Sequence, residues 1–342
     1  MALQTRSLIL LTSATLVLVA LAIVVLASGD RGISRAARSE PAFPALAAKL
    51  GDVASVTVSR NGTTMTLIRD GDSWLVAEKG NYRANAAKIS QIVRAMADLT
   101  LVEPKTQKPD LYSRLEVEDP GNGKSSLVAI KDKSGRAVAK AIVGKRRYDR
   151  LGAGNDGVYL RKPGEAQAWL ARGSLDPSGD PASWLDRHII DISEKKIAQV
   201  TLTQADGSKL VISRAAPDAS FAVADAPADT KFKSESTTSG PAAALETLDL
   251  DDVKPAGELP VPDKDVSTAS FTTFDGLTVD LRLMERDKSN WIAISASGSG
   301  PGEAEAKKID DKVAHWTYGI PGYKANLLKT KLADLIEPAK GS

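Results

Sequence analysis

The pattern of apolar and polar positions divides this chain into one continuous apolar run at its start and alternating patterns after it. Leu8 to Ala27 spans 20 residues without a charged side chain. At about 1.5 Å per residue such a helix is roughly 30 Å long, which is enough to cross a hydrocarbon core once. A cleaved signal peptide is the alternative, but its apolar region usually has only about 7 to 15 residues. We therefore predict a membrane anchor over residues 1–30.

A polar segment separates the anchor from the first alternating pattern. Residues 31–50 are rich in Ala, Arg, Ser and Pro, and two prolines interrupt any helix there, which is typical of a tether. Apolar and polar side chains then alternate from Val53 to Val58, and Asn61-Gly62 separates this strand from a second one. Asn-Gly between two alternating strands is a strong hairpin signal. With a third strand after it, the pattern predicts an antiparallel meander.

The period changes to that of a helix after the meander. Apolar residues from Ile89 to Leu99 recur at intervals of three and four, and Asn85 is suited to cap the first turn. One amphipathic helix can cover one face of a small antiparallel sheet. Further strand-like segments follow at residues 126–130, 137–143, 157–161 and 167–170. This order of strands, helix and strands predicts a first α+β module over residues 51–183.

The same order of elements returns after Trp184. Val56 corresponds to Val200, an offset of 144 residues, and a second helix is expected at Gly240–Leu250. Each helix is followed by a Val-x-Pro segment. The sequence therefore predicts two repeated modules of antiparallel sheet, each with a covering helix, the second over residues 184–342 with a C-terminal aromatic and helical segment. The alternative is that any two antiparallel meanders look alike.

Composition changes this picture mainly by exclusion. The chain has 342 residues, 42% hydrophobic and 26% charged, which are globular values and enough for two ordinary domains. Its 45 basic and 43 acidic side chains leave a net charge of +2, so there is no general electrostatic case for nucleic acid. The absence of cysteine excludes disulfides, thiolate nucleophiles and cysteine-ligated zinc.

Two short patterns resemble ligand sites but have simpler explanations. Gly152 to Gly157 fits G-x-G-x-x-G, yet a dinucleotide site needs a helix after the last glycine, and Val158-Tyr-Leu160 is strand-like. We interpret this segment as a glycine-rich hairpin loop. Lys145-Arg146-Arg147 could contact phosphate or anionic lipid headgroups. A solvated strand end is the simpler interpretation, because two aspartates are close in sequence.

Candidate catalytic residues lack the contexts that catalysis requires. His188 and His315 are the only histidines, they are far apart, and no nucleophile elbow is present. We interpret His188 as part of a packed connector between the modules. The acidic run Asp249, Asp251 and Asp252 could contribute to a carboxylate pair for glycoside cleavage, but we expect it to end the second module's helix. We predict no catalytic residue, no metal ligand and no cofactor.

Aromatic residues gather near the C-terminal end of a chain that has only 5% of them. Trp316, Tyr318 and Tyr323 lie within one short segment. Core packing is the first explanation for these residues, and an edge that binds a partner protein is the second.

Several of these segments together resemble one known family. They are the Trp74 strand, the stretch Tyr82 to Leu99 running into Val102-Glu-Pro104, the segment Leu115-Glu-Val-Glu-Asp-Pro120, the pair Trp169-Leu-Ala and Trp184-Leu-Asp-Arg187, and the ending His315-Trp-Thr-Tyr318 to Leu335. This combination covers nearly the whole chain after the tether and resembles the DUF4340 family. The motifs are structural and specify no catalytic residue.

The resemblance implies a bacterial protein with one membrane span, found beside an ABC-2 type exporter and a gliding-motility-type auxiliary protein. We expect a noncatalytic accessory protein that binds the ABC-2 type permease, its auxiliary subunit or the exported material. Positive charges flank the span on both sides, but the short leading tail and the resemblance favour a single-pass inner-membrane protein with its large domain outside the cytoplasm. An anchored hydrolase acting on carbohydrate or peptide and a lipid or glycan carrier are the alternatives.

Overall fold

The computed structural model describes residues 40–337 except 122, 149–155, 178–179, 225 and 228. The predicted anchor at Leu8–Ala27 lies outside these residues. Within the described ranges, no helix is long and apolar enough to cross a membrane.

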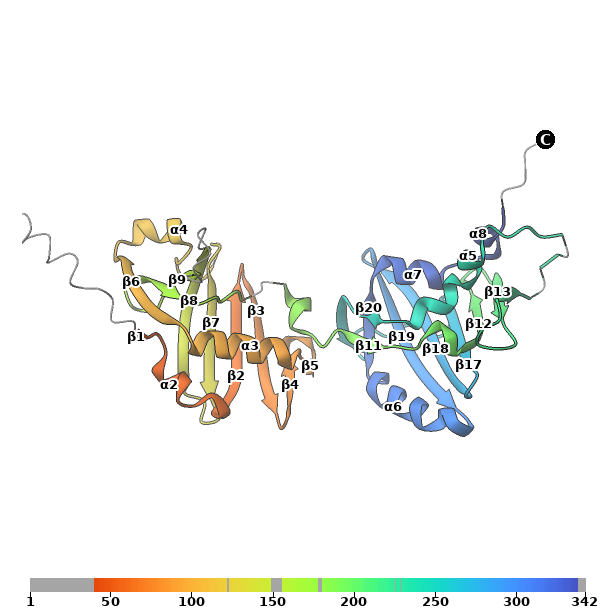
Figure 1. Ribbon diagram of the computed structural model, residues 1–342, viewed down its shortest axis with the longest axis horizontal. Helices are drawn as coiled ribbons and strands as arrows, with labels where there is room; N and C mark the ends of the chain where they lie inside the picture. Colours follow the sequence, from red (N-terminus) through yellow and green to blue (C-terminus); the bar gives the residue numbers. More distant parts are fainter. Residues whose placement is uncertain are drawn as a thin grey trace, which may run out of the picture. The chain divides into compact units, whose positions relative to one another are not determined.

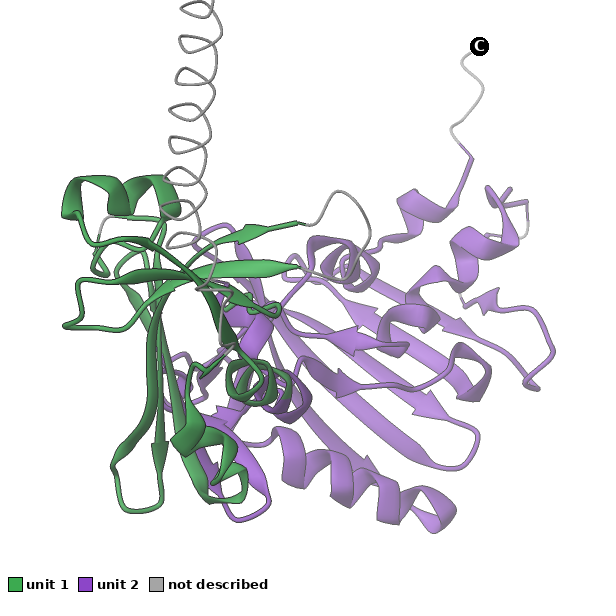
Figure 2. Ribbon diagram, turned by 60° about the vertical axis from the view of Figure 1, so that its left-hand side comes forward, with its two compact units in different colours: residues 1–64, 91–179 green, residues 65–90, 180–342 purple. Residues whose placement is uncertain are grey.

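Two compact units make up the chain (Figure 2). Unit 1 comprises Met1–Thr64 and Gln91–Gly179, and unit 2 comprises Met65–Ser90 and Asp180–Ser342. The described residues form mostly antiparallel sheets with few helices, so the α+β class expected from the sequence describes them.

The larger sheet has the strand order β1-β6-β10-β9-β8-β7-β2-β3-β4-β5. Its strands are β1 Glu40–Pro41, β2 Val53–Arg60, β3 Thr63–Asp70, β4 Ser73–Val76, β5 Tyr82–Arg83, β6 Thr100–Thr106, β7 Ser126–Asp132, β8 Ala137–Arg147, β9 Gly157–Arg161 and β10 Ala168–Arg172. The accompanying helices are α2 Pro44–Ala47, α3 Ala86–Ala97 and α4 Tyr112–Leu115, with a 3-10 turn, η2, at Ala77–Lys79. Figure 1 shows α3 crossing one face of this sheet.

The second sheet has the order β14-β13-β12-β17-β18-β19-β20-β16. Its strands are β12 Ile197–Thr203, β13 Lys209–Ser213, β14 Ala222–Val223, β16 Asp252–Pro255, β17 Ser267–Thr273, β18 Leu277–Arg286, β19 Ser289–Gly298 and β20 Trp316–Ile320. A separate pair joins β11 His188–Ile190 to β15 Leu248–Asp249. The helical segments are η5 Glu194–Lys196, α5 Glu235–Ser239, η6 Gly240–Leu245, α6 Glu303–Val313, α7 Gly322–Leu328 and α8 Leu332–Leu335.

The two sheets share one internal order when each is read from the strand that follows its helical segment. The orders are β6-β10-β9-β8-β7-β2-β3-β4 and β16-β20-β19-β18-β17-β12-β13-β14. The registers agree as well, because Val56 pairs with Ile130 and Val200 pairs with Phe271 on the corresponding strands.

Alternation along the strands places one face of the second sheet in the core. On β18, Leu277, Val279, Leu281 and Leu283 are buried, whereas Asp280 between them is exposed. Helix α6 packs on β18 and β19, and α7 contacts β17 and β19; Figure 1 shows both helices on the same face of the sheet. Burying each of these aliphatic side chains stabilises the fold by about 1.5 to 3 kcal/mol. The helices therefore cover the apolar face of the sheet.

The predicted hairpin at Asn61-Gly62 is confirmed. Both residues have positive φ, 50° and 75°, as the favoured two-residue hairpin turn requires. The Ser59 and Thr64 hydroxyls form a hydrogen bond of 2.9 Å beside the turn.

The first predicted helix is confirmed, whereas the second differs from the prediction. Asn85 Oδ1 accepts a hydrogen bond of 3.0 Å from the Lys88 N–H and caps α3. The segment predicted as a helix at Gly240–Leu250 contains the 3-10 helix η6 instead, preceded by α5. Pro241 has no N–H to continue the α-helical bonding, so the α-helix stops at Ser239.

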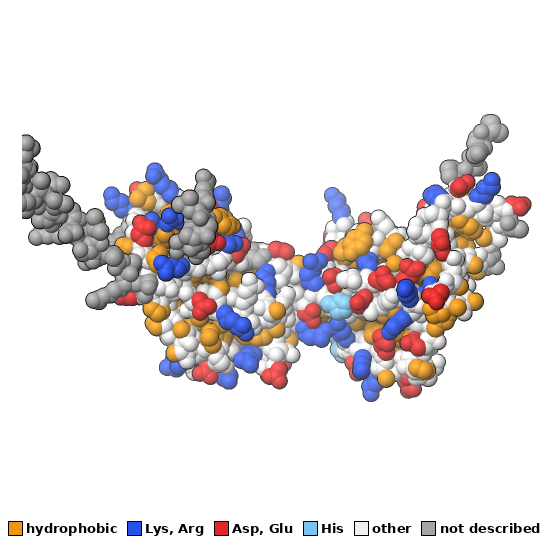
Figure 3. All heavy atoms as spheres, viewed as in Figure 1, with side chains coloured by type: hydrophobic (Ala, Val, Ile, Leu, Met, Phe, Trp, Pro, Cys, Tyr) orange, Lys and Arg blue, Asp and Glu red, His pale blue; other side chains and the backbone are white. Residues whose placement is uncertain are grey.

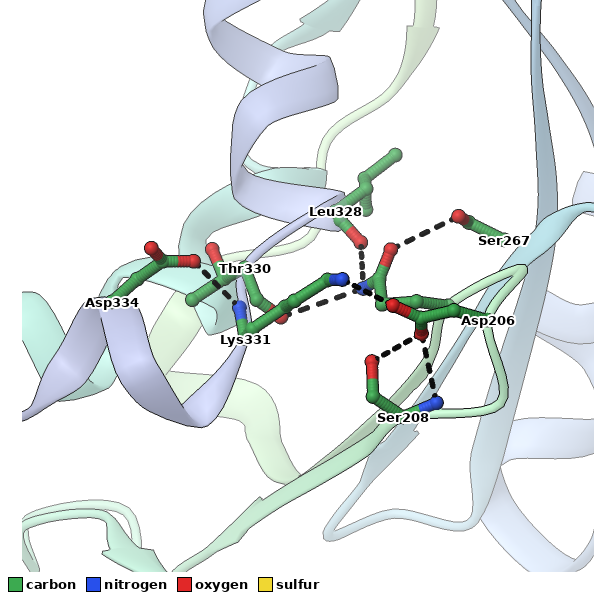
Figure 4. Close-up of polar contacts among 8 residues, drawn as sticks. Asp206, Ser208, Ser267, Leu328, Thr330, Lys331 and Asp334 are labelled. Carbon is green, nitrogen blue, oxygen red and sulfur yellow. Dashed lines mark hydrogen bonds and ion pairs between the residues drawn. The ribbon is translucent and has the colours of Figure 1, made fainter.

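A buried glutamine attaches the C-terminal segment to the turn after β12 (Figure 4). Gln204 Nε2 donates to the carbonyl oxygens of Leu328 at 3.2 Å and Thr330 at 3.4 Å, while its Oε1 accepts from a β17 serine at 3.0 Å. Beside it, Lys331 Nζ lies 2.5 Å from Asp206 Oδ2, and this hydrogen bond lowers the pKa of the Asp206 carboxyl well below its usual range. Exposed ion pairs contribute little, so the buried amide provides most of the attachment.

The turn after β4 covers the edge strand β16 of unit 2. Lys79 Nζ lies 2.5 Å from Asp252 Oδ1, and Gly80 packs directly on Pro255. An uncovered edge strand presents unpaired backbone groups that promote association, so this contact also protects the sheet.

We expect Gly80→Ala to destabilise the protein more than the matched variant Gly71→Ala. Both glycines have positive φ, 63° and 57°, but a Cβ on Gly80 would lie 2.5 Å from Pro255 Cγ, whereas one on Gly71 would meet nothing within 4 Å. The backbone cost of about 1 to 2 kcal/mol is therefore common to both, and the clash adds about 1 to 3 kcal/mol for Gly80→Ala. Urea unfolding of the full-length chain measures the difference. Equal losses would show that Gly80 does not pack on Pro255 in solution.

Candidate functional site

A cavity of about 530 Å³ lies in unit 2, beside the end of β13 and the start of α5. Its walls come from η5, the loop after β13 and α5. The lining residues are Glu194, Arg214, Pro217, Asp218, Ala219, Ser220, Phe221, Ser234, Glu235, Ser236 and Ser239. Sites for small ligands usually have volumes of roughly 300 to 1,000 Å³, so this cavity is large enough to hold one.

Arg214 is held rigidly in the wall of this cavity. Its Nε donates to the Ile197 carbonyl at 2.9 Å, and its Nη2 donates to the Glu194 carbonyl at 2.5 Å. The guanidinium lies 4.4 Å from the centroid of the Phe221 ring and 5.9 Å from that of Phe274. Arginine has five N–H donors, so the bonds to these two carbonyls leave others to meet a ligand.

Serine hydroxyls and carboxylates line the same cavity as the arginine. Ser234 caps α5 by accepting a hydrogen bond of 3.1 Å from the Thr237 N–H, and its hydroxyl lies 3.0 Å from that of Ser236. The Ser220 hydroxyl donates to Glu235 Oε1 and joins the loop after β13 to α5. The folding of α5 therefore places hydroxyl groups and a carboxylate on one wall.

The cavity can both donate and accept hydrogen bonds at several neighbouring points. Carboxylates accept from ligand hydroxyls, arginine donates, and serine does both. Phe221 adds an apolar surface at the same place. This combination suits a polyhydroxylated ligand. Sequence reasoning missed the cavity because its residues come from three separate segments without a recognised motif. The serines at 234, 236 and 239 were the available signal.

Electrostatics give no single-sign surface on the face of the molecule drawn in Figure 3. Acidic and basic side chains are interspersed over that face of both units, which agrees with a net charge of +2. The mixed pattern means that local clusters, rather than a broad field, select charged ligands.

The three aromatic candidates occupy different environments. Tyr318 on β20 is fully buried, and Trp316 is partly buried on the same strand. Tyr82, which the sequence analysis did not single out, joins them: its ring centroid lies 4.9 Å from that of Trp316 and 6.2 Å from that of Tyr318, both edge-on. Tyr323 lies apart on α7 and is 64% exposed. Trp316 and Tyr318 therefore pack within unit 2, while Tyr323 is the accessible ring among the three.

The residue after Tyr323 is fixed by buried contacts. Lys324 donates from Nζ to the carbonyl of Ala243 at 3.2 Å and to that of Glu246, at the end of η6. Burial lowers the pKa of its ammonium group. These bonds satisfy carbonyls that end a helical segment, so they fix the start of α7 and the position of Tyr323.

The acidic run does not end a helix, which corrects that prediction. Asp249 belongs to β15, where its Oδ1 lies 3.4 Å from His188 Nδ1 on β11. Asp251 pairs with Arg187 at 2.9 Å, and Asp252 on β16 pairs with Lys79. Each carboxylate thus has its own partner. Among the described residues, no group of three or more His, Asp or Glu side chains could hold a metal ion.

The remaining candidates from the sequence lie in different parts of the structure. Gly152 and Gly154 lie outside the described residues, but Gly157 begins strand β9 and no helix follows it, as the hairpin interpretation expects. His315 precedes β20, and its carbonyl accepts a 2.9 Å hydrogen bond from the Ala256 N–H. Lys145 lines a second cavity, in unit 1.

The family profile described as "Domain of unknown function (DUF4340)" matches residues 74–265, which is more than half of the 342 positions. The chain belongs to the DUF4340 family. No curated protein matches it with significant similarity. The cavity residues from Glu194 to Ser239 lie inside the DUF4340 match, whereas Trp316, Tyr318 and Tyr323 follow it.

Two buried tyrosine hydroxyls predict that the stability of this DUF4340 protein depends on pH. Among the described residues, the hydroxyls of Tyr82 and Tyr318 have no hydrogen-bond partner. Burial raises the pKa of Tyr82 to about 12 and raises that of Tyr318 still further. The charged phenolate is unfavourable there because burial removes its hydration, and the positive charge of Arg83 offsets only part of this loss.

We expect the wild type to lose more stability than Tyr82→Phe as pH rises above 10. Below pH 10 this tyrosine is neutral in both states, so it adds no pH dependence. Between pH 10 and about 12 the unfolded chain loses the proton and the folded chain keeps it, so the free energy of unfolding falls, by about 1 kcal/mol at pH 11. Urea unfolding at pH 8 and pH 11 measures this, and the lysines titrate alike in both proteins. The same loss in both would contradict the raised pKa.

Proposed function

We propose that this DUF4340 protein is a noncatalytic, membrane-anchored accessory protein of an ABC-type export system, and that the cavity in unit 2 binds the exported material. The observation that carries this proposal is the rigid Arg214 in a cavity of about 530 Å³ lined by serine hydroxyls and carboxylates. The chemistry favours a polyhydroxylated ligand such as an oligosaccharide over a lipid, because a lipid carrier needs a continuous apolar groove.

The exporter and the compartment rest on the family. The resemblance implies an ABC-2 type permease or its auxiliary subunit as partner, with Leu8–Ala27 as a single inner-membrane span and the large domain outside the cytoplasm. Tyr323 supports a partner surface, because it is 64% exposed at the start of a helix that Lys324 fixes. Tyrosine on a rigid support is typical of protein interfaces.

The proposal also includes an origin by duplication. Besides the common strand order, Trp169 pairs with Pro104 and Trp316 pairs with Pro255 at corresponding places in the two sheets. A chance likeness between meanders would not extend to the last strands of the sheets. Two copies of one module would have diverged so that the second carries the polar cavity.

One observation favours a second candidate function, an envelope hydrolase acting on carbohydrate. Glu194, Asp218 and Glu235 all line the same cavity. Glycoside cleavage uses two carboxylates on either side of the scissile bond. The binding experiment below therefore includes a test for cleavage.

We expect the full-length protein in detergent micelles to bind members of an oligosaccharide panel that includes neutral sugars, amino sugars and uronic acids. Glu235→Gln and Arg214→Lys should each weaken binding roughly tenfold, since each changes a charged hydrogen bond. Glu258→Gln, at an exposed position outside the cavity, is the matched control. Labelled protein on an array and titration calorimetry measure the affinities.

Failure of the folded protein to bind any panel member, or equal binding by all variants, would contradict the binding function. Shortening of an oligosaccharide by the wild type but not by Glu235→Gln would establish the hydrolase instead.

We expect Tyr323→Ala to reduce the recovery of an ABC permease or its auxiliary subunit several-fold in a pull-down of the full-length, membrane-extracted protein. Loss of an exposed anchoring ring removes interface area without disturbing the core. Leu50→Ala is the matched control, because Leu50 is also a large exposed apolar residue but belongs to unit 1 and lines neither cavity. Mass spectrometry of the bound proteins gives the ratio. If intact wild type recovers no exporter component, the partner assignment fails.

A further inference from the structure

A second cavity, of about 310 Å³, concentrates positive charge in unit 1. Its charged lining residues are Arg60, Lys124, Lys145, Arg146, Glu116 and Asp176. Four cations against two carboxylates leave two positive charges in excess, as many as the net charge of the whole 342-residue chain. Cations collected in one concave place raise the local concentration of anions.

The carboxylates in this cavity only partly neutralise the cations. Lys124 Nζ lies 3.9 Å from Glu116 Oε1, and Arg146 Nη1 lies 3.9 Å from Asp176 Oδ2. Both separations exceed hydrogen-bond distance. In the described part of the chain, no ion pair joins Arg60 or Lys145 to a carboxylate. The cations are therefore available to an incoming anion.

The backbone of β8 is shaped to bring these side chains together. Pairing with β9 shifts register between Val143 and Arg146, so one extra residue bulges at this place. Such bulges re-aim side chains and are common beside functional sites. A Cβ on Gly144 would lie 2.2 Å from the Leu115 carbonyl oxygen, so glycine allows the chain after α4 to touch the strand. Glu116 follows there with φ 59°, which turns the chain at the cavity.

We propose that this cavity binds a phosphate group carried by a lipid headgroup or by a soluble phosphate compound. The planar guanidinium of arginine can donate two parallel hydrogen bonds to phosphate oxygens, and the flexible lysine side chain adds a positive charge with further N–H donors. The Arg146 guanidinium lies 4.9 Å from the centroid of the Tyr148 ring, which limits its freedom. The proposal gives Lys145 and Arg146 the phosphate contact that the sequence left open beside a solvated strand end. The inference does not rest on the proposed export function, because it concerns another unit and another chemistry.

The test uses the full-length protein in neutral detergent micelles and two probes, inorganic phosphate and dihexanoylphosphatidylglycerol below its micellar concentration. Titration calorimetry measures both affinities at low salt and again with added sodium chloride. Lys145→Gln and Arg60→Gln should each weaken binding roughly tenfold, and Asp176→Asn should strengthen it. Lys140→Gln is the matched control: Lys140 is an exposed lysine on the same strand but outside the cavity. Circular dichroism checks that each variant is folded.

Tighter binding of the short lipid than of inorganic phosphate identifies a lipid headgroup as the source, whereas equal or weaker binding identifies a soluble phosphate compound. Either result supports the site if Lys145→Gln weakens binding and Lys140→Gln does not. The inference is overturned if the folded wild type binds neither probe at millimolar concentration, or if both lysine variants bind like the wild type.

Discussion

The burial of apolar side chains on paired strands determines the strand registers and the positions of the covering helices. Val56 on β2 lies opposite Ile130 on β7, and Val200 on β12 lies opposite Phe271 on β17. Because side chains alternate between the two sides of a strand, a shift of one residue would move each of these groups to the opposite face. The register is therefore fixed by burial, and helices such as α6 follow the face that the register makes apolar.

Because the strand registers are fixed by the core, both candidate ligand sites lie where strands end or bulge. Arg214 lies directly after β13, and Lys145 lies at the bulge of β8. At such positions the backbone leaves the regular ladder, so side chains from neighbouring segments can converge. The two cavities differ in chemistry because the first gathers hydroxyls and carboxylates and the second gathers cations. Two sheets that share one strand order can carry two such sites, since changes at strand ends leave the paired core intact.

The buried cluster around Tyr82 shows how an edge strand is protected at some cost. Tyr82 packs edge-on against Trp316 and Tyr318, and the adjoining turn lies on Pro255 of β16. Aromatic contacts and apolar burial stabilise this arrangement, while two buried hydroxyls without partners among the described residues oppose it. The protein tolerates the unpaired hydroxyls because the rings bury large apolar areas.

The sequence by itself determined the local elements and their α+β class. Alternation predicted β2, Asn61-Gly62 predicted the turn, and Asn85 marked the start of α3, because each depends on neighbours along the chain. The prediction of a second α-helix at Gly240–Leu250 was wrong, because Pro241 interrupts the α-helical hydrogen bonding. Only tertiary structure decided that Tyr82 joins Trp316, and that Arg214 and Glu235 line one cavity. Such sites depend on contacts between distant segments, and no period or spacing along one strand encodes them.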